Sequence, residues 1–197
     1  MTTQEDLWRG SFGDAYHARQ KPNVMADFLF WGRVLQCAPG IHSAIEFGAG
    51  TGSNLRALSH MLPDSKLWGV EVNDEAAARI SYGQVLRCSI LDSYDWPLCD
   101  LALTKGLLIH IAPEGLPRAY AALYYASRRY ICVAEYYSPT PRIIPYHDHD
   151  DALWARGFAG EMMQQYPNLE VIDYGFAWRG DRLAPQDDVT WFLLEKR

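Results

Sequence analysis

A glycine-rich turn between two apolar runs constrains this chain more than any other feature. The run IHSAIEF, residues 41–47, is apolar and is typical of a short buried strand. Three glycines follow at alternate positions, Gly48, Gly50 and Gly52, and the next run, NLRALSHML, has helical spacing and ends before a proline. A strand, a glycine-rich loop and a helix in this order predict a cradle for a nucleotide-like ligand.

Strand and helix patterns alternate along the rest of the chain. We expect strands at 41–47, 66–72, 84–90, 100–106 and 128–137, and helices at 54–62, 74–82, 114–127 and 154–166. Two late strands, 169–176 and 188–196, are expected to form an antiparallel hairpin at the sheet edge. This pattern predicts an α/β fold of the Rossmann-like kind, with a mostly parallel seven-stranded sheet, helices on both faces and a ligand at the carboxyl ends of the strands.

The first 40 residues precede this sheet. They contain a helical pattern, ADFLFWGRVL, and an earlier block, WRGSFGDAYHAR, in which glycines interrupt an aromatic and charged run. We expect residues 1–40 to form an N-terminal helical cap or lid and residues 41–197 to form the sheet domain, within one structural domain overall. In this hypothesis Trp8, Phe12 and Tyr16 face the ligand and exclude water from it.

Composition and charge exclude several classes of protein. The net charge is −6, whereas a nucleic-acid-binding protein is expected to carry a basic stripe. No apolar run is long enough to cross a membrane, and the polar start MTTQEDLWRG is unlike a signal peptide, so we expect a cytoplasmic protein. The four cysteines lack C-x-x-C spacing, and free thiols are expected.

The glycine loop does not match the common phosphate-binding patterns. A G-x-G-x-x-G fingerprint requires a third glycine at the position of Ser53, and no Gly-Lys-Ser/Thr follows as in a Walker A loop. Glu46 ends the strand beside the loop, where its carboxylate would repel a pyrophosphate and attract an amine. Glu71 ends the next strand, where a carboxylate can accept both hydroxyls of a ribose. A ligand with a ribose, no phosphate and a cationic amino-acid tail is S-adenosyl-L-methionine.

With these residues the sequence resembles the class I S-adenosylmethionine-dependent methyltransferases. Their first motif is an acid followed by G-x-G-x-G, and a second acid ends the second strand. The resemblance implies their Rossmann-like methyltransferase fold, an adenine site at the end of the third strand in CSILD with Asp92 slightly late, and a methyl-transfer cleft at TKGLLIH. The expected cofactor-binding residues are Glu46, Gly48, Gly50, Gly52, Glu71, Val72, Ser89, Ile90, Lys105 and Tyr16.

A narrower resemblance spans nearly the whole chain, from Trp8 to Lys196. The blocks WRGSFGDAY, LTKGLLIHI, AEYYSPTP, FAGEMM and PQDDVTWFLLEK are similar to the pseudaminic acid biosynthesis-associated methylase family. This resemblance implies a small polar acceptor, such as a sialic-acid-like amino sugar or its precursor. Related small methyltransferases of natural-product pathways also act on anionic metabolites.

The chemistry of the acceptor decides which residues are needed. An alcohol needs a general base, for which His110, Glu135 and His147 are the catalytic candidates. A carboxylate or phosphonate needs only a cationic clamp. The expected substrate-binding residues are Lys105, Tyr136, Tyr137, Tyr146, Arg142 and Arg156. Packing or surface roles are the alternative for each of these side chains.

The segment YHDHDD, residues 146–151, invites a metal-site interpretation. Loop residues at this spacing do not converge by themselves, so no metal is predicted, and helix capping by its aspartates is the alternative.

The sequence therefore predicts methyl transfer from S-adenosylmethionine to a hydroxyl or amine of a small polar metabolite, with an amino-sugar precursor as the leading acceptor. O-methylation of a small anionic (carboxylate or phosphonate) natural-product intermediate is the alternative. The expected partner is the small-molecule acceptor, with no nucleic acid or membrane, and the protein is expected to be a monomer or homodimer. A nicotinamide-dependent oxidoreductase and a non-catalytic binding domain are the other classes considered.

Overall fold

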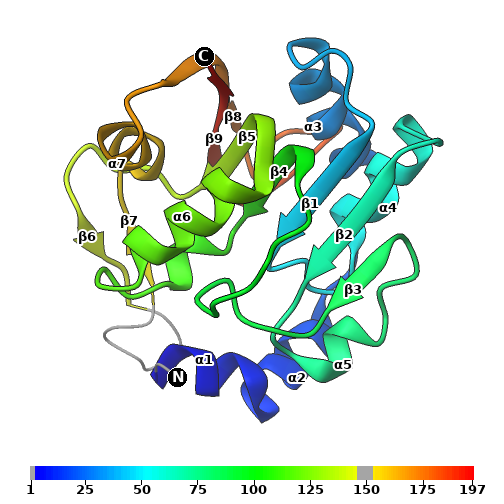
Figure 1. Cartoon of the computed structure of the whole chain (residues 1–197). Helices are drawn as coiled ribbons and strands as arrows, with labels where there is room; N and C mark the ends of the chain where they lie inside the picture. Colours follow the sequence, from blue (N-terminus) through cyan, green and yellow to red (C-terminus); the bar gives the residue numbers. More distant parts are fainter. Residues whose placement is uncertain (1–2, 146–152) are drawn as a thin grey trace.

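A seven-stranded sheet organises the computed structural model, which describes residues 3–145 and 153–197 (Figure 1). The strand order is β3-β2-β1-β4-β5-β9-β8, in which the first five are parallel and β9 runs antiparallel to both its neighbours. The predicted fold class and edge hairpin are thereby confirmed. The strands are β1 Ser43–Phe47, β2 Lys66–Val70, β3 Gln84–Leu86, β4 Cys99–Lys105, β5 Ser127–Glu135, β8 Leu169–Ala177 and β9 Val189–Lys196.

Helices cover both faces of the sheet. On one face, α3 (Val24–Gln36) and α4 (Ser53–Met61) bury apolar side chains against residues such as Leu101 and Leu103 of β4. On the other, α6 (Leu116–Ala126) and α7 (Phe158–Gln165) pack on the intervening residue, Ala102. Because strand side chains alternate between faces, a parallel strand covered on both sides reads as a continuous apolar run, which is what the sequence predicted.

The N-terminal residues divide between two layers. Helix α3, with its fully buried Trp31, belongs to the layer that also holds α4. By contrast, α1 (Thr3–Arg9) and α2 (Ser11–Arg19) lie across the end of the sheet to which the arrows of β1 and β2 point, close to α5 (Asp74–Ala77) (Figure 1). We call α1 and α2 together the N-terminal cover.

Several predicted element boundaries are wrong. The helix expected from Trp154 begins at Phe158, because Trp154–Ala155 forms a short strand, β7, that pairs with β6 (Arg142–Ile143). The helix expected at 74–82 ends at Ala77, and the third strand ends at Leu86. A single 3₁₀ turn, η1 (Leu108–His110), follows β4. Of the residues that fall outside these predicted elements, Cys88, Ser89 and Ile90 line a pocket at the end of the sheet.

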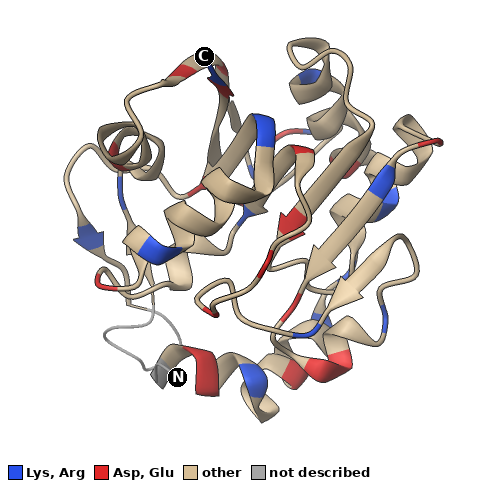
Figure 2. Cartoon of the chain, in the orientation of Figure 1, with Lys and Arg blue, Asp and Glu red and all other residues tan. Residues whose placement is uncertain are grey.

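Charged residues occur in most elements of the described chain. Figure 2 shows Lys and Arg spread over many elements, whereas acids recur in α1, α2 and α5 around the cover. Of the helices that the structure describes, none has the length and apolar character needed to cross a bilayer.

Candidate active site

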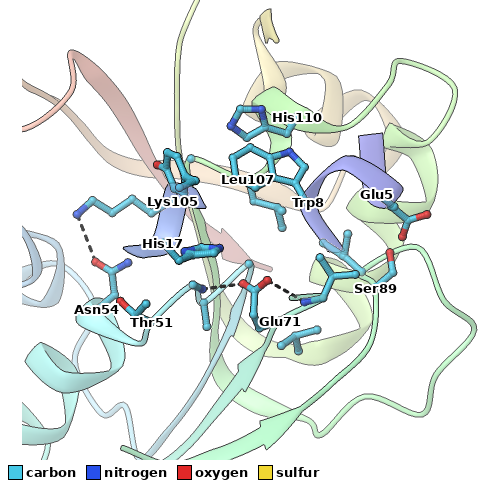
Figure 3. Close-up of a pocket in the computed structure, with 18 of the residues that line it drawn as sticks. Glu5, Trp8, His17, Thr51, Asn54, Glu71, Ser89, Lys105, Leu107 and His110 are labelled. Atoms are coloured by element: carbon cyan, nitrogen blue, oxygen red, sulfur yellow. Dashed lines mark hydrogen bonds between the residues drawn. The ribbon is translucent and has the colours of Figure 1, made fainter. Parts of the chain in front are cut away.

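A pocket of about 230 Å³ lies between the carboxyl ends of the strands and the N-terminal cover (Figure 3). The loops after β1, β2, β3 and β4 form its floor and walls, and α1 and α2 close it from above. Most of the predicted cofactor-binding residues line it: Gly48, Gly50, Glu71, Val72, Ser89, Ile90, Lys105 and Tyr16. Glu46 and Gly52 are not among the lining residues.

The glycine loop is shaped by backbone that other residues rarely adopt. Gly48 has φ 71°, and a Cβ added there would lie 2.8 Å from Leu107 Cδ1. Its N–H donates to the carbonyl of Val70 over 2.8 Å, which fixes the loop against β2. Gly52, at φ 83°, instead turns the chain into α4. The loop therefore exposes backbone to the pocket, and Gly52 supports it from outside.

Glu71 is the most highly connected acid of the site. Its Oε1 accepts hydrogen bonds from the backbone N–H groups of Val72 and Asn73, at 2.9 and 2.8 Å, and its Oε2 accepts from Gly50 N at 2.7 Å. A carboxylate offers about four lone-pair positions, so these three bonds hold its orientation and leave acceptor capacity toward the pocket. The remaining position suits the recognition of a ribose hydroxyl.

Glu46 lies behind the pocket wall. Its side chain is fully buried, Oε1 accepts from Asn54 Nδ2 at 2.6 Å, and Oε2 finds no hydrogen-bond partner among the described residues. Burial raises the pKa of this carboxyl to about 8, against the opposing effects of the Asn54 hydrogen bond and the Lys105 charge. Asn54 lines the pocket and is bonded to Glu46, whereas Glu46 is not among the lining residues, so its contact with the cofactor stays a prediction.

Lys105 belongs to a buried ion pair. Its Nζ lies 3.0 Å from Asp27 Oδ1 and donates to Asn54 Oδ1 over 3.3 Å, and it sits 4.8 Å from the centroid of the Phe30 ring. Asn54 Oδ1 also accepts from the indole N–H of Trp31 at 3.0 Å, so its amide orientation is fixed. This network places one cation and one hidden acid at the same end of the pocket.

The opposite end of the pocket is mainly apolar. Val72 and Ile90 line it, and the polar groups of the turn after β3 are used locally. Asp92 Oδ2 accepts from Ser89 N at 2.9 Å, and Ser89 Oγ accepts from Leu91 N at 3.0 Å. Asp92 therefore shapes the turn and does not line the pocket.

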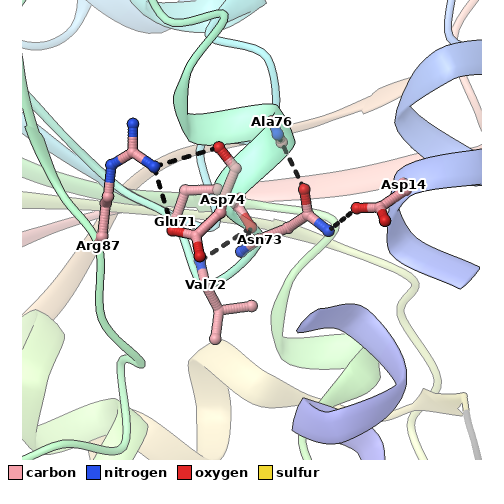
Figure 4. A network of polar contacts seen from close by, with 7 residues as sticks. All are labelled: Asp14, Glu71, Val72, Asn73, Asp74, Ala76 and Arg87. Carbon is pink, nitrogen blue, oxygen red and sulfur yellow. Dashed lines mark hydrogen bonds and ion pairs between the residues drawn. The ribbon is translucent and has the colours of Figure 1, made fainter. Parts of the chain in front are cut away.

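Asn73 fastens the N-terminal cover to the sheet end (Figure 4). Its Oδ1 caps α5 by accepting from Ala76 N at 2.8 Å, while its Nδ2 donates to Trp8 O at 3.0 Å and Asp14 Oδ1 at 2.8 Å. A Cβ on Gly13 would lie only 2.0 Å from Trp8 O, which explains the glycine at this point of α2.

Trp8 forms the centre of an aromatic cluster that connects the N-terminal cover to η1. Its ring lies 5.4 Å from Phe12, 5.1 Å from Tyr16 and 4.6 Å from His110, measured between centroids. Trp8 and Tyr16 line the pocket, as predicted, whereas Phe12 is absent from the lining and supports Trp8 from behind.

His17 is a site residue that the sequence predictions missed. It lines the pocket and is 8% exposed, and burial lowers its pKa, although the charge of Glu71 acts in the opposite direction. Asn54 and Glu5 were missed as well. A polar residue in the first turn after the glycine loop was the available signal for Asn54, and the block that contains Trp8 and Tyr16 was the signal for His17.

The three predicted catalytic residues differ in their position relative to the pocket. His110 lines the pocket at the end of η1, next to Trp8 (Figure 3). Glu135 does not line this pocket, and its catalytic role stays a prediction: it is buried, and its oxygens accept hydrogen bonds from Leu107 N at 3.1 Å and Ile109 N at 3.3 Å. It thereby holds the turn that carries His110. His147 lies outside the described residues.

The remaining predicted substrate contacts do not line the pocket. Arg156 Nε donates a hydrogen bond of 2.8 Å to Glu161 Oε1. Arg142 lies exposed in β6. The ring centroid of Tyr137 lies 5.8 Å from that of Phe192. Tyr136 packs beside the core. Tyr146 lies outside the described residues, as does the metal interpretation of YHDHDD. Within residues 3–145 and 153–197, no cluster of His, Cys, Asp and Glu could hold a metal ion.

Solved structures with this fold are numerous and distant in sequence. A 1,6-didemethyltoxoflavin-N1-methyltransferase from Burkholderia thailandensis, with bound 1,6-didemethyltoxoflavin and S-adenosylhomocysteine, has a TM-score of 0.70 at 15% identity, over 98% of this chain and 86% of that one. The magnesium protoporphyrin IX methyltransferase of Synechocystis PCC 6803, with bound S-adenosylhomocysteine, has a TM-score of 0.66 at 12% identity, over 98% and 97%.

The plantazolicin methyltransferase BpumL, in complex with S-adenosylhomocysteine, has a TM-score of 0.65 at 15% identity, over 98% of this chain and 94% of that one. No protein-family model matches the sequence, and no curated protein is significantly similar to it. The chain therefore has the Rossmann-like fold of the S-adenosylmethionine-dependent methyltransferases.

Proposed function

We propose that this protein transfers a methyl group from S-adenosylmethionine to a small molecule. The observation that carries the proposal is Glu71, held by three backbone amides at the floor of a pocket whose wall is an open glycine loop. The fold supports it, because the methyltransferases with this fold include several with S-adenosylhomocysteine bound.

The residues present fit this cofactor along the whole pocket. Glu71 suits the ribose hydroxyls, and the apolar pair Val72 and Ile90 suits the flat adenine ring. The amino-acid tail is a zwitterion, for which Lys105 offers a cation to the carboxylate, and the buried Glu46 balances the ammonium once it releases its proton. The unpartnered Oε2 of Glu46 is consistent with a cationic group bound nearby.

The cofactor would supply an electrophilic methyl group. The protein aligns the acceptor with that group, excludes water and provides a proton acceptor. The N-terminal cover, held by Asn73, excludes water from the pocket. His110 is proposed as the general base that takes the proton from the acceptor hydroxyl or amine. Glu135 holds the turn on which that imidazole lies.

A hydroxyl or amine acceptor fits the pocket better than an anion. Of the described lining residues, Lys105 alone is a lysine or arginine, and it is paired with Asp27. Arg142 and Arg156, the two arginines among the expected substrate-binding residues, lie outside the pocket lining. Together with the resemblance to the pseudaminic acid biosynthesis-associated methylases, this favours a polar acceptor such as an amino-sugar precursor.

A methyl-transfer assay tests the proposal. The protein is incubated with S-adenosylmethionine labelled in the methyl group and with panels of amino sugars, other polyols and amines, and carboxylates or phosphonates. We expect label to enter the hydroxyl or amine panels and His110→Gln to abolish that transfer while leaving S-adenosylhomocysteine binding intact. Transfer to the anionic panel alone would contradict the assignment of the acceptor.

A further inference from the structure

The two ends of the pocket differ in chemistry, and this difference orients the ligand. Lys105, Asn54 and the hidden Glu46 lie at one end, Val72 and Ile90 at the other, and Glu71 lies between them. A nucleoside with a zwitterionic tail places the tail at the charged end and the base at the apolar end. The inference below concerns that base and rests on the proposed function.

The turn after β3 has few polar side-chain groups left to recognise an adenine. Asp92 is bonded to Ser89 N and lies outside the pocket lining, and Ser89 Oγ already accepts from Leu91 N. The 6-amino group of adenine is a hydrogen-bond donor and needs an acceptor when it is taken from water. A carboxylate acceptor at this end of the pocket is offered by another part of the pocket wall.

Glu5 of α1 provides an acidic side chain at this end. It lines the pocket and is half-buried, and Figure 3 shows it next to Ser89. Among the described lining residues, Glu5 and Glu71 are the two carboxylates. An ionised carboxylate can only accept hydrogen bonds, which matches an amino group and mismatches a carbonyl oxygen.

The position of Glu5 is fixed by the rest of the cover. Glu5 precedes Trp8 by three residues in α1, so the two side chains lie on the same face of the helix. Trp8 is held by its carbonyl through Asn73 and by its ring against Tyr16 and His110. The contacts of Trp8 thus help to hold the face of α1 on which Glu5 lies against the pocket.

We propose that Glu5 reads the 6-amino group of the adenine, so that base specificity comes from the N-terminal cover and not from the sheet. The carboxylate accepts a hydrogen bond from the amino group of an adenine. A 6-oxo base places a carbonyl oxygen against the same carboxylate and is rejected. Binding of the base then brings it into contact with the N-terminal cover.

Calorimetry with two ligands tests this inference. S-adenosylhomocysteine and S-inosylhomocysteine differ at the 6-position of the base, and their dissociation constants are compared on the full chain. We expect the wild-type protein to bind the inosyl ligand about tenfold or more weakly. Glu5→Gln should reduce this preference to about threefold or less, because an amide can donate to a carbonyl oxygen.

Two further variants complete the test. Asp6→Asn removes a neighbouring exposed charge that is not part of the pocket lining and should keep the wild-type preference. Glu5→Ala should weaken S-adenosylhomocysteine binding by about fivefold or more and lose the preference, and it serves if Glu5→Gln fails to fold. An unchanged preference in Glu5→Gln or Glu5→Ala, or equal wild-type binding of both ligands, overturns the inference.

The outcomes separate this inference from the proposed function. If the wild-type protein binds S-adenosylhomocysteine and Glu71→Ala does not, the proposed function stands whatever the Glu5 variants show. If the wild-type protein fails to bind S-adenosylhomocysteine, the proposed function fails and this inference fails with it.

Discussion

The carboxylate of Glu71 accepts a hydrogen bond of 2.7 Å from the backbone N–H of Gly50, which ties the end of β2 to the glycine loop after β1. The same side chain accepts from Val72 N and Asn73 N at the approach to α5. One buried acid therefore organises both the loop and the start of the helix that anchors the cover. We infer that the ribose site is already formed before a ligand arrives, so little binding free energy is needed to order it.

Asn73→Asp is expected to free the N-terminal cover while leaving the core intact. Aspartate caps a helix as well as asparagine does, so α5 should persist. The two bonds donated by Nδ2 to Trp8 O and Asp14 are lost, and the new carboxylate repels Asp14. We expect faster limited trypsin cleavage at Arg9 and Arg19 and about fivefold or more weaker S-adenosylhomocysteine binding, with the melting temperature within a few degrees of wild type.

Asp14→Ala is the control for this effect, since it removes one bond of the cover and leaves the cap untouched. It should give an intermediate cleavage rate. Identical cleavage rates in all three proteins would show that Asn73 does not hold the cover.

Glu46 is expected to release a proton when the ligand binds. Its pKa of about 8 means that the carboxyl is mostly protonated at pH 7, and an ammonium on the pocket side of Asn54 lowers that pKa through its charge. Calorimetric titration with S-adenosylhomocysteine, in two buffers of different ionisation enthalpy, should show release of up to about one proton per ligand. Glu46→Gln should show little or none, and equal release by both proteins would contradict this role.

Glu135 is expected to make stability depend on pH. Burial raises its pKa to about 7 in the folded protein, above the ordinary value of a glutamate, so the folded state holds a proton that the unfolded state has lost. This contribution is fully present below about pH 4 and is lost as the pH rises through 7. Glu135→Gln does not titrate, and at pH 5 it should be destabilised by about 1–3 kcal/mol through an imperfectly bonded turn.

Denaturant titrations at pH 5, 6, 7 and 8 measure this difference. The gap in unfolding free energy between wild type and Glu135→Gln should narrow as the pH rises. The control is Glu114→Gln, which replaces an exposed acid of the loop before α6. The difference in unfolding free energy between wild type and this control should be the same at all four pH values. A gap that widens with pH would contradict the protonated state of Glu135.

The fold could be predicted because its signals are local. The central parallel strands β1 and β4 are covered on both faces, so they read as apolar runs, and the helices between the strands show their own period. The ligand site at the strand ends follows from this topology, and Glu71 follows from its place at the end of β2. The ends of helices and strands were harder to predict from the sequence, because a strand such as Trp154–Ala155 depends on pairing with Arg142–Ile143.

The side-chain contacts within the site could not be predicted in the same way. All five residues of β1 are buried, so the sequence gives no alternation that tells whether Glu46 faces the pocket or the core. The partner of Lys105 is Asp27, 78 residues away, and Asn54 connects both to Glu46. Such contacts arise from packing between α3, α4 and β4, which no short motif records.

Calorimetric titration of wild type and Glu71→Ala with S-adenosylhomocysteine tests the central claim most directly. We expect the wild-type protein to bind one equivalent. Glu71→Ala, with its secondary structure intact by circular dichroism, should bind about 30-fold or more weakly, because the ribose and the glycine loop lose their shared acceptor. No binding by the wild-type protein, or equal affinity in the two proteins, would contradict it.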